Sequence, residues 1–137
     1  MSGIVAYIDG GARGNHGPAG YGVHVETDPG EPIEEFHGFI GSTTNNIAEY
    51  NGLLAALRYA TERGHRIIRI KSDSELVVKQ MLGQYKVKHP GLQPLYQEAQ
   101  ALARGLERVT YECIRREQNK DAARLANQAM DEGTAGR

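Results

Sequence analysis

The 137-residue chain has one cysteine, no tryptophan and no hydrophobic run long enough to span a membrane. The single residue Cys113 excludes an intrachain disulfide and is typical of a reducing compartment. We expect its thiol to be half-buried in a strand. The short apolar segment near the amino terminus has no basic stretch before it, so no signal peptide is predicted. We therefore expect a soluble cytoplasmic protein.

Neither sign of charge is in excess, because 16 Lys and Arg face 17 Asp and Glu for a formal net charge of -1. A chain with this balance has no overall attraction to nucleic acid, so any polyanion would be held by local groups. The hydrophobic content of 39% and the length fit a single domain with a real core. No apolar stripe indicates a dimer, and we expect a monomer.

The apolar pattern predicts an α/β protein. An apolar run over residues 4–8 predicts a strand that ends in a turn at Asp9-Gly10-Gly11. Period-two and period-3.6 patterns alternate through the rest of the chain, which gives the order β-β-β-α-β-α-α-β-α and a five-stranded mixed sheet with helices on both faces. The further strands are expected near residues 20–27, 33–39, 66–71 and 109–113, and the helices at 46–63, 73–82, 95–106 and from 119.

The end of the chain differs in composition from the rest. We place one domain at residues 1–132 and a flexible tail at residues 133–137. Because this tail is rich in small residues, it is also typical of the start of a linker, and the domain would then be part of a longer protein.

Three carboxylates stand where structure is expected to change. Each has a local explanation: Asp9 in an Asx turn, Glu49 in a capping box with Asn46, and Asp73 at a helix amino terminus. These explanations do not account for all three lying at the ends of elements that topology would make neighbours. Crevices at strand ends of α/β sheets hold ligands, and grouped carboxylates suit a hard cation such as Mg²⁺.

Four segments follow one another along the chain: YIDGGARGN, TTNNIAEYNGLLAAL, SDSELVVKQM and REQNKDAARLANQAMD. In this order they resemble the ribonuclease H type 1 family, and the resemblance covers nearly the whole chain. The connection over residues 86–94 is short, as in compact members that lack a basic insertion. The resemblance implies a ribonuclease H-like fold. It also implies an endonuclease that hydrolyses the RNA strand of RNA/DNA hybrids with two Mg²⁺ ions, or with Mn²⁺, and leaves 5′-phosphate ends.

The same resemblance assigns roles to individual positions. Asp9, Glu49 and Asp73 correspond to metal ligands, and the first of them would bridge both ions. Hybrid recognition must distinguish 2′-hydroxyls from deoxyribose, which favours amides and backbone groups in a shallow groove. For the amides the alternative is capping and turn formation, and for the arginine at the end of the last strand it is a solvated side chain. The substrate-binding positions implied are Gly10, Gly11, Ala12, Arg13, Asn15, Thr44, Asn45, Asn46, Gln80 and Arg116.

The last segment departs from the family at one position, because Ala123 stands where a fourth catalytic Asp is typical. Asp121 is two residues away and would point roughly 200° around the helix, so we do not expect it to substitute. Either an engineered change or a natural variant with a weakened second metal site explains Ala123. Three functions stay open: an impaired hybrid endonuclease, an inactive hybrid-binding module, and the hybrid-binding domain of a larger enzyme.

Overall fold

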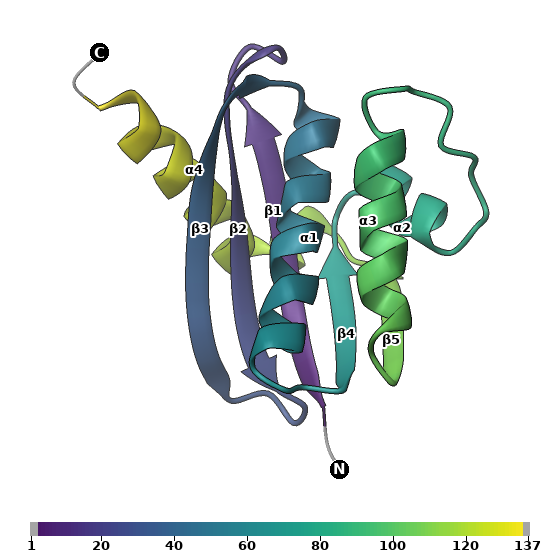
Figure 1. Cartoon of the computed structure of the whole chain (residues 1–137). Helices are drawn as coiled ribbons and strands as arrows, with labels where there is room; N and C mark the ends of the chain where they lie inside the picture. The colour runs from purple at the N-terminus through teal and green to yellow at the C-terminus, as the bar shows by residue number, and fades with distance from the viewer. Residues whose placement is uncertain (1–2, 136–137) are drawn as a thin grey trace.

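The computed structural model describes residues 3–135 and confirms the predicted order of elements (Figure 1). A short 3-10 turn, Arg116–Gln118, precedes the last helix. The strands are β1 Ile4–Ala12, β2 Gly17–Thr27, β3 Pro32–Thr43, β4 Ile67–Ser72 and β5 Arg108–Cys113, and the helices are α1 Asn45–Glu62, α2 Glu75–Met81, α3 Gln93–Arg104 and α4 Lys120–Thr134.

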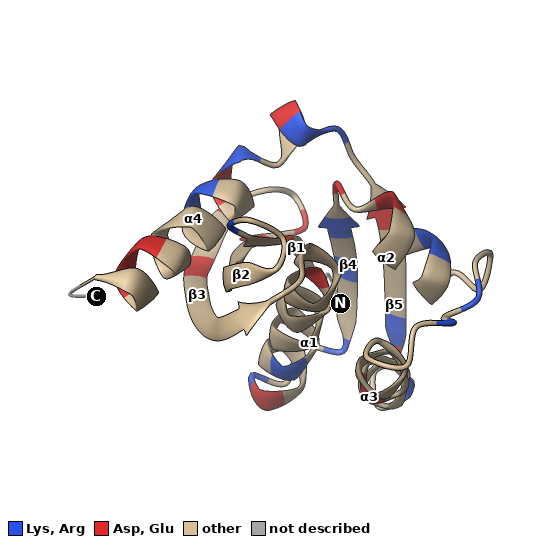
Figure 2. Ribbon diagram, turned by 90° about the horizontal axis from the view of Figure 1, so that it is seen from above, with Lys and Arg blue, Asp and Glu red and all other residues tan. Residues whose placement is uncertain are grey.

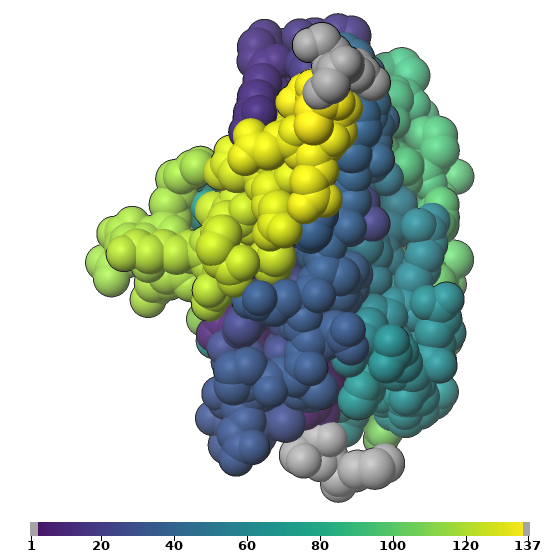
Figure 3. Space-filling view, turned by 90° about the vertical axis from the view of Figure 1, so that its left-hand side faces the viewer, coloured from purple at the N-terminus to yellow at the C-terminus, as the bar shows by residue number. Residues whose placement is uncertain are grey.

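The five strands form one mixed sheet in the order β3-β2-β1-β4-β5. The pairs β1–β2 and β2–β3 are antiparallel, whereas β1–β4 and β4–β5 are parallel. Helices α1 and α3 cover one face, and α4 lies on the opposite face across β2 and β3 (Figures 1 and 3). This arrangement confirms the predicted mixed sheet with helices on both faces. Within the described residues, no helix combines the length and apolarity that crossing a membrane requires.

Helix α1 supplies much of the core. Tyr50, Leu53, Leu54 and Leu57 recur at helical spacing and are at most 1% exposed, because this stripe packs against the sheet. Truncation of one such leucine to alanine typically costs about 2–5 kcal/mol of stability. The Tyr50 hydroxyl also donates a 2.6 Å hydrogen bond to Gln80 Oε1 of α2. The start of α1, which carries Glu49, is thereby fixed on the sheet.

Glycines let helix backbones approach the sheet on both sides of Asp9. A Cβ atom at Gly10 would overlap the backbone of Ala48 in α1. A Cβ atom at Gly22, the β2 partner of Asp9, would overlap the backbone of Ala122 in α4. Both helices are therefore held by backbone contact where the candidate site lies.

Strand β1 does not end at Asp9, so the predicted turn at that residue is wrong. The strand stays paired with β2 as far as Ala12, whereas its pairing with β4 ends at Ile8 opposite Ser72. The turn follows at Gly14 and Asn15, which have positive φ angles of 88° and 30°. Asp9 therefore lies inside a strand, at the point where one of its two neighbours has ended.

Two smaller expectations concern the far end of the chain. Cys113 is exposed rather than half-buried, because β5 is an edge strand. Helix α4 continues through Thr134, so residues 133 and 134 are helical. Of the predicted tail, residues 136–137 lie outside the described part of the chain.

Candidate active site

A pocket of about 460 Å³ opens beside Asp9. Nine of its lining residues were predicted from the sequence, and three residues of α4 complete it. The pocket thus joins β1, α1, α4 and the turn before α4. The predicted members are Asp9, Gly10, Gly11, Ala12, Arg13, Asn45, Asn46, Glu49 and Arg116, and the others are Ala126, Asn127 and Met130.

The three predicted acids converge through the sheet topology. Asp9 follows the last β1–β4 pair, Asp73 follows the end of β4, and Glu49 reaches in from α1. Burial, with the charge of Asp73 next, raises the Asp9 pKa to about 6. Burial, with the charges of Asp9 and Asp73 adding to it, raises the Glu49 pKa to about 7. Burial, with the repulsion between these carboxylates added to it, therefore favours their protonated forms near neutral pH.

A bound cation would relieve this repulsion. The donor set consists of carboxylate oxygens, which suit a hard ion such as Mg²⁺. The one positive side chain that lowers the pKa of both Asp9 and Glu49 is Arg116. It lies on the loop between β5 and α4, whose tip carries charges of both signs (Figure 2). Asp9 and Glu49 line the pocket, whereas Asp73 does not line it and acts on both through its charge. The residues present therefore fit a divalent ion beside Asp9 and Glu49.

The predicted capping box is wrong, since the N-cap of α1 is Thr44 rather than Asn46. The Thr44 hydroxyl accepts a hydrogen bond of 3.3 Å from the Ile47 amide. Glu49 is thereby free of any capping role, and the Ser74 side chain beside its carboxyl lowers the Glu49 pKa against the larger effect of burial. This acid belongs to the pocket and not to the helix cap.

Two amides join the β1–β2 turn to the start of α1. Asn45 Oδ1 accepts a 2.7 Å hydrogen bond from the Ala12 amide, and Asn15 Oδ1 accepts one of 2.8 Å from the Asn45 amide. Within residues 3–135 the Asn45 side chain makes no other hydrogen bond, and the exposed Asn46 side chain makes none. Their N–H groups stay available to a ligand.

A second hollow of about 320 Å³ adjoins the pocket and shares Asn45 and Asn46 with it. Asn15 and Thr44 line this hollow, together with His89 of the loop between α2 and α3. The polar residues predicted to contact substrate thus form one continuous lining. The structure brings Asn15 and Thr44 to this lining although neither reaches the larger pocket.

Gln80 does not join the other predicted substrate-binding residues. Its side chain is 4% exposed, accepts the Tyr50 hydrogen bond and donates one of 3.4 Å to the Lys86 carbonyl. Those contacts hold α1, α2 and the following loop together. We assign Gln80 a structural position and no contact with a ligand.

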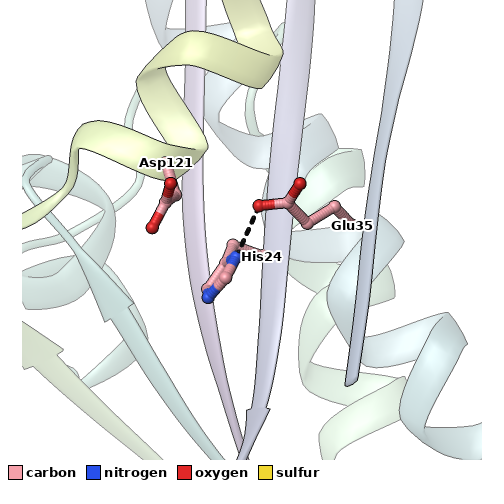
Figure 4. Close-up of side chains that lie close together, drawn as sticks. All are labelled: His24, Glu35 and Asp121. Atoms are coloured by element: carbon pink, nitrogen blue, oxygen red, sulfur yellow. Dashed lines mark hydrogen bonds and ion pairs between the residues drawn. The ribbon is translucent and has the colours of Figure 1, made fainter. Parts of the chain in front are cut away.

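Ala123 lies in the first turn of α4, where its amide donates to the Asn119 carbonyl at 3.1 Å. The neighbouring Asp121 does not line the pocket: it lies with His24 and Glu35 on the sheet (Figure 4). Asp131 also points elsewhere, to an ion pair with Arg13 at 2.7 Å. Neither Asp121 nor Asp131 lines the pocket.

Asn119 was missed as a site residue. It is 1% exposed, and its Nδ2 donates a 2.9 Å hydrogen bond to the Ile8 carbonyl, next to Asp9. This bond ties the start of α4 to β1. An Asn before a helix is so common a cap that the sequence offered no signal for this longer contact. Asn127, also missed, donates from Nδ2 to the Ala123 carbonyl at 3.0 Å and lines the pocket.

Known proteins resemble this chain over nearly its full length. A family profile described as "Reverse transcriptase-like" matches residues 7–129. The "Ribonuclease HI" of Halobacterium salinarum is 38% identical over 129 residues, which are 94% of this chain and 65% of that protein. The crystal structure of RNase H1 from the same archaeon has a TM-score of 0.91 at 37% identity, and the match covers 94% of this chain and 98% of that one. The chain belongs to the ribonuclease H type 1 family.

Two further matches to this ribonuclease H type 1 chain are a longer mycobacterial protein and a structure solved with an RNA/DNA hybrid. The "Bifunctional protein Rv2228c" of Mycobacterium tuberculosis is 50% identical over 129 residues. This match covers 93% of the chain but 35% of that relative, so the chain spans about a third of its length. LC11-RNase H1, solved in complex with an RNA/DNA hybrid, has a TM-score of 0.92 at 38% identity, and the match covers 96% of this chain and 99% of that one. The predicted ribonuclease H fold is confirmed.

Proposed function

We propose that the chain binds RNA/DNA hybrids and hydrolyses their RNA strand in the presence of Mg²⁺. The observation that carries this proposal is the convergence of Asp9, Glu49 and Asp73 beside a polar lining. Family membership and the hybrid-bound relative LC11-RNase H1 support the same substrate. Asp9, Glu49 and Asp73 would hold the metal, and the chain would act as a monomer.

The chain's own residues would orient the substrate rather than attract it by charge. The available N–H groups of Asn45 and Asn46 suit 2′-hydroxyl oxygens, because they are neutral donors in a shallow groove. Arg116 would lie near the phosphate of the scissile bond, since its charge already acts on Asp9 and Glu49. Mg²⁺ ions, when bound, supply charge that activates water and stabilises the departing oxygen.

Ala123 makes reduced turnover the expected state of this chain. Ala123 stands where the family resemblance places a carboxylate, one turn before the pocket-lining Asn127, so one ligand for a second ion would be lost while the amide lining stays intact. We therefore expect this chain to bind a hybrid readily and to cleave it slowly. A hybrid-binding module that does not cleave is the second candidate, and Ala123 is the observation that favours it.

The cleavage test compares this chain with an Ala123→Asp variant on a labelled RNA/DNA hybrid, in Mg²⁺ and in Mn²⁺. We expect the variant to cut faster by about tenfold or more, which corresponds to about 1.4 kcal/mol of transition-state stabilisation. Asn127→Asp is the matched control, since it adds a carboxylate to the same pocket one turn farther along α4. We expect it to give no such gain.

Three outcomes would contradict parts of this assignment. Equal rates for the chain and for Ala123→Asp would mean that another group completes the site. A gain from Asn127→Asp as large as from Ala123→Asp would show only that added charge helps. Cleavage that survives Asp9→Asn in both backgrounds would remove the proposed metal site altogether.

A longer parent protein is a further proposal. It rests on the relative of which the matched region is 35%. In such a protein this domain would bind the hybrid, and another domain would carry a second activity. Binding of the isolated chain to a hybrid, measured by fluorescence anisotropy, tests whether the domain alone suffices.

A further inference from the structure

A second group of potential metal ligands lies outside the pocket, on the face of the sheet that α4 covers. His24 of β2, Glu35 of β3 and Asp121 of α4 each offer a donor atom, and these atoms all lie within 4.8 Å of one another (Figure 4). None of the three residues lines the candidate active site. The group joins two strands to the first turn of the helix.

The imidazole of His24 is buried between two carboxylates. It is 5% exposed, Nδ1 lies 2.7 Å from Glu35 Oε2, and Nε2 lies 2.9 Å from Glu26 Oε2. In metal sites the ring nitrogen that does not bind metal commonly donates its proton to a carboxylate, which fixes the tautomer. Both ring nitrogens of His24 face carboxylates, and although burial opposes protonation, the hydrogen bonds with Glu35 and Glu26 raise the His24 pKa. A metal ion would therefore bind Nδ1 by displacing the proton that Nδ1 shares with Glu35.

The site is open to an ion from solvent on its other side. The side chains of Glu35 and Asp121 are 37% and 58% exposed, whereas that of His24 is 7% exposed. A buried nitrogen donor beneath two accessible carboxylates gives an ion both an entry path and an anchor. This combination differs from a surface group of acids, which lacks a fixed nitrogen ligand.

A positive group already lies between the two carboxylates. Arg124 Nη2 is 2.7 Å from Glu35 Oε2 and 3.4 Å from Asp121 Oδ1. With Glu26 included, three carboxylates share this one arginine and His24. The position of Arg124 therefore marks where a cation is stabilised, and the same guanidinium would compete with a metal ion for both oxygens.

We propose that His24, Glu35 and Asp121 form a structural zinc site, with water completing the coordination and Arg124 displaced. A mixed imidazole and carboxylate set suits Zn²⁺, whereas Mg²⁺ requires an octahedral shell of oxygens. The bound ion would fasten the first turn of α4 to β2 and β3. It would thereby stabilise the fold two residues from Ala123, independently of hybrid cleavage.

The test is a titration of the full chain with Zn²⁺, followed by isothermal calorimetry in an Asp9→Asn background that weakens metal binding in the pocket. We expect one ion per chain. Glu35→Gln and Asp121→Asn should each weaken binding by about tenfold or more. His37→Gln is the matched control, because His37 pairs with Glu132 at the surface and should leave zinc affinity unchanged.

The variant Arg124→Gln distinguishes a metal site from a group of residues whose role is only to form ion pairs within the fold. Removal of the competing guanidinium should tighten zinc binding, although it deletes two ion pairs. Replacement of zinc by Co²⁺ adds a spectroscopic readout, since visible absorption of tetrahedral cobalt should be lost in Asp121→Asn. Absence of binding, or binding that Glu35→Gln and Asp121→Asn leave unchanged, overturns the proposal. Weaker binding in Arg124→Gln does so as well.

Discussion

At the scale of single residues, position decides what each carboxylate does. Asp9 and Glu49 are half-buried next to like charges, and both have raised pKa values. Asp121 is two residues before Ala123 in α4, which turns its side chain roughly 200° around the helix. It therefore lies beside His24 and Glu35 and not in the pocket. Residue type alone would not distinguish these acids. Their places on β1, α1 and α4 do.

The raised pKa values predict how stability depends on pH when no metal is present. The folded chain binds protons on Asp9 and Glu49 more tightly than the unfolded chain, whose values are 3.8 and 4.5. The resulting stabilisation is complete below those values and is lost as pH rises through about 6 and about 7. In EDTA we expect the free energy of unfolding to fall by roughly 1–3 kcal/mol over this range.

Urea unfolding at a series of pH values measures this effect, and Mg²⁺ should reverse it on the alkaline side. Asp9→Asn is the control, because an amide does not titrate and the remaining slope should be shallower. A slope identical in the chain and in Asp9→Asn would contradict the assignment of the effect to this pocket.

At the scale of elements, α4 is fastened to the sheet at its first turn. Asn119 donates to the Ile8 carbonyl, and the α4 backbone at Ala122 lies against Gly22. The ion pair of Arg13 with Asp131 adds a contact near the other end of the helix. The distance between Ala123 and Asp9 is therefore set by contacts on both sides of position 123.

We expect Asn119→Ala to lower the free energy of unfolding by about 1–3 kcal/mol, because the buried Ile8 carbonyl loses its donor. The Asn119 Oδ1 atom has no hydrogen-bond partner among the described residues, so its removal should cost little. Denaturant unfolding measures the change. Gln128→Ala removes an exposed hydrogen bond from the same helix and should change stability by less than about 0.5 kcal/mol. Similar losses in both variants would contradict the specific role of Asn119.

At the scale of the whole molecule, the net charge of -1 limits how strongly the chain can attract a nucleic acid. The pocket carries two arginines, and Arg13 is already paired with Asp131. Binding to a hybrid would therefore depend on the amides of the lining more than on phosphate neutralisation.

This balance predicts a weak salt dependence of hybrid binding. We expect the slope of log K against log salt concentration to be shallower than about -3, measured by anisotropy in Ca²⁺ to prevent cleavage. Arg116→Gln should reduce the slope by about 1, in line with the loss of one phosphate contact. A steep slope that falls in a Lys86→Gln, Lys88→Gln variant would instead show that the loop between α2 and α3 holds the substrate.

Sequence patterns predicted the order of elements and most of the pocket, because apolar periodicity fixes strands and helices and the family segments carry the polar lining. The patterns placed the end of β1 wrongly at Asp9, since Gly10 and Gly11 are typical of turns, whereas here both lie in β1 and Gly10 packs against the α1 backbone. They also missed Asn119, whose partner Ile8 is 111 residues away. Contacts of this range leave no local signal.

The close approach of α4 to Gly22 also affects which substitutions this chain could accept during evolution. Side chains in a core can shift to absorb a substitution, but a helix held through its backbone keeps its place whichever side chain stands at position 123. A loss of the carboxylate there would leave the rest of the pocket assembled. The difference between a domain that cuts and one that only holds its substrate would then be a single codon, open to change in either direction.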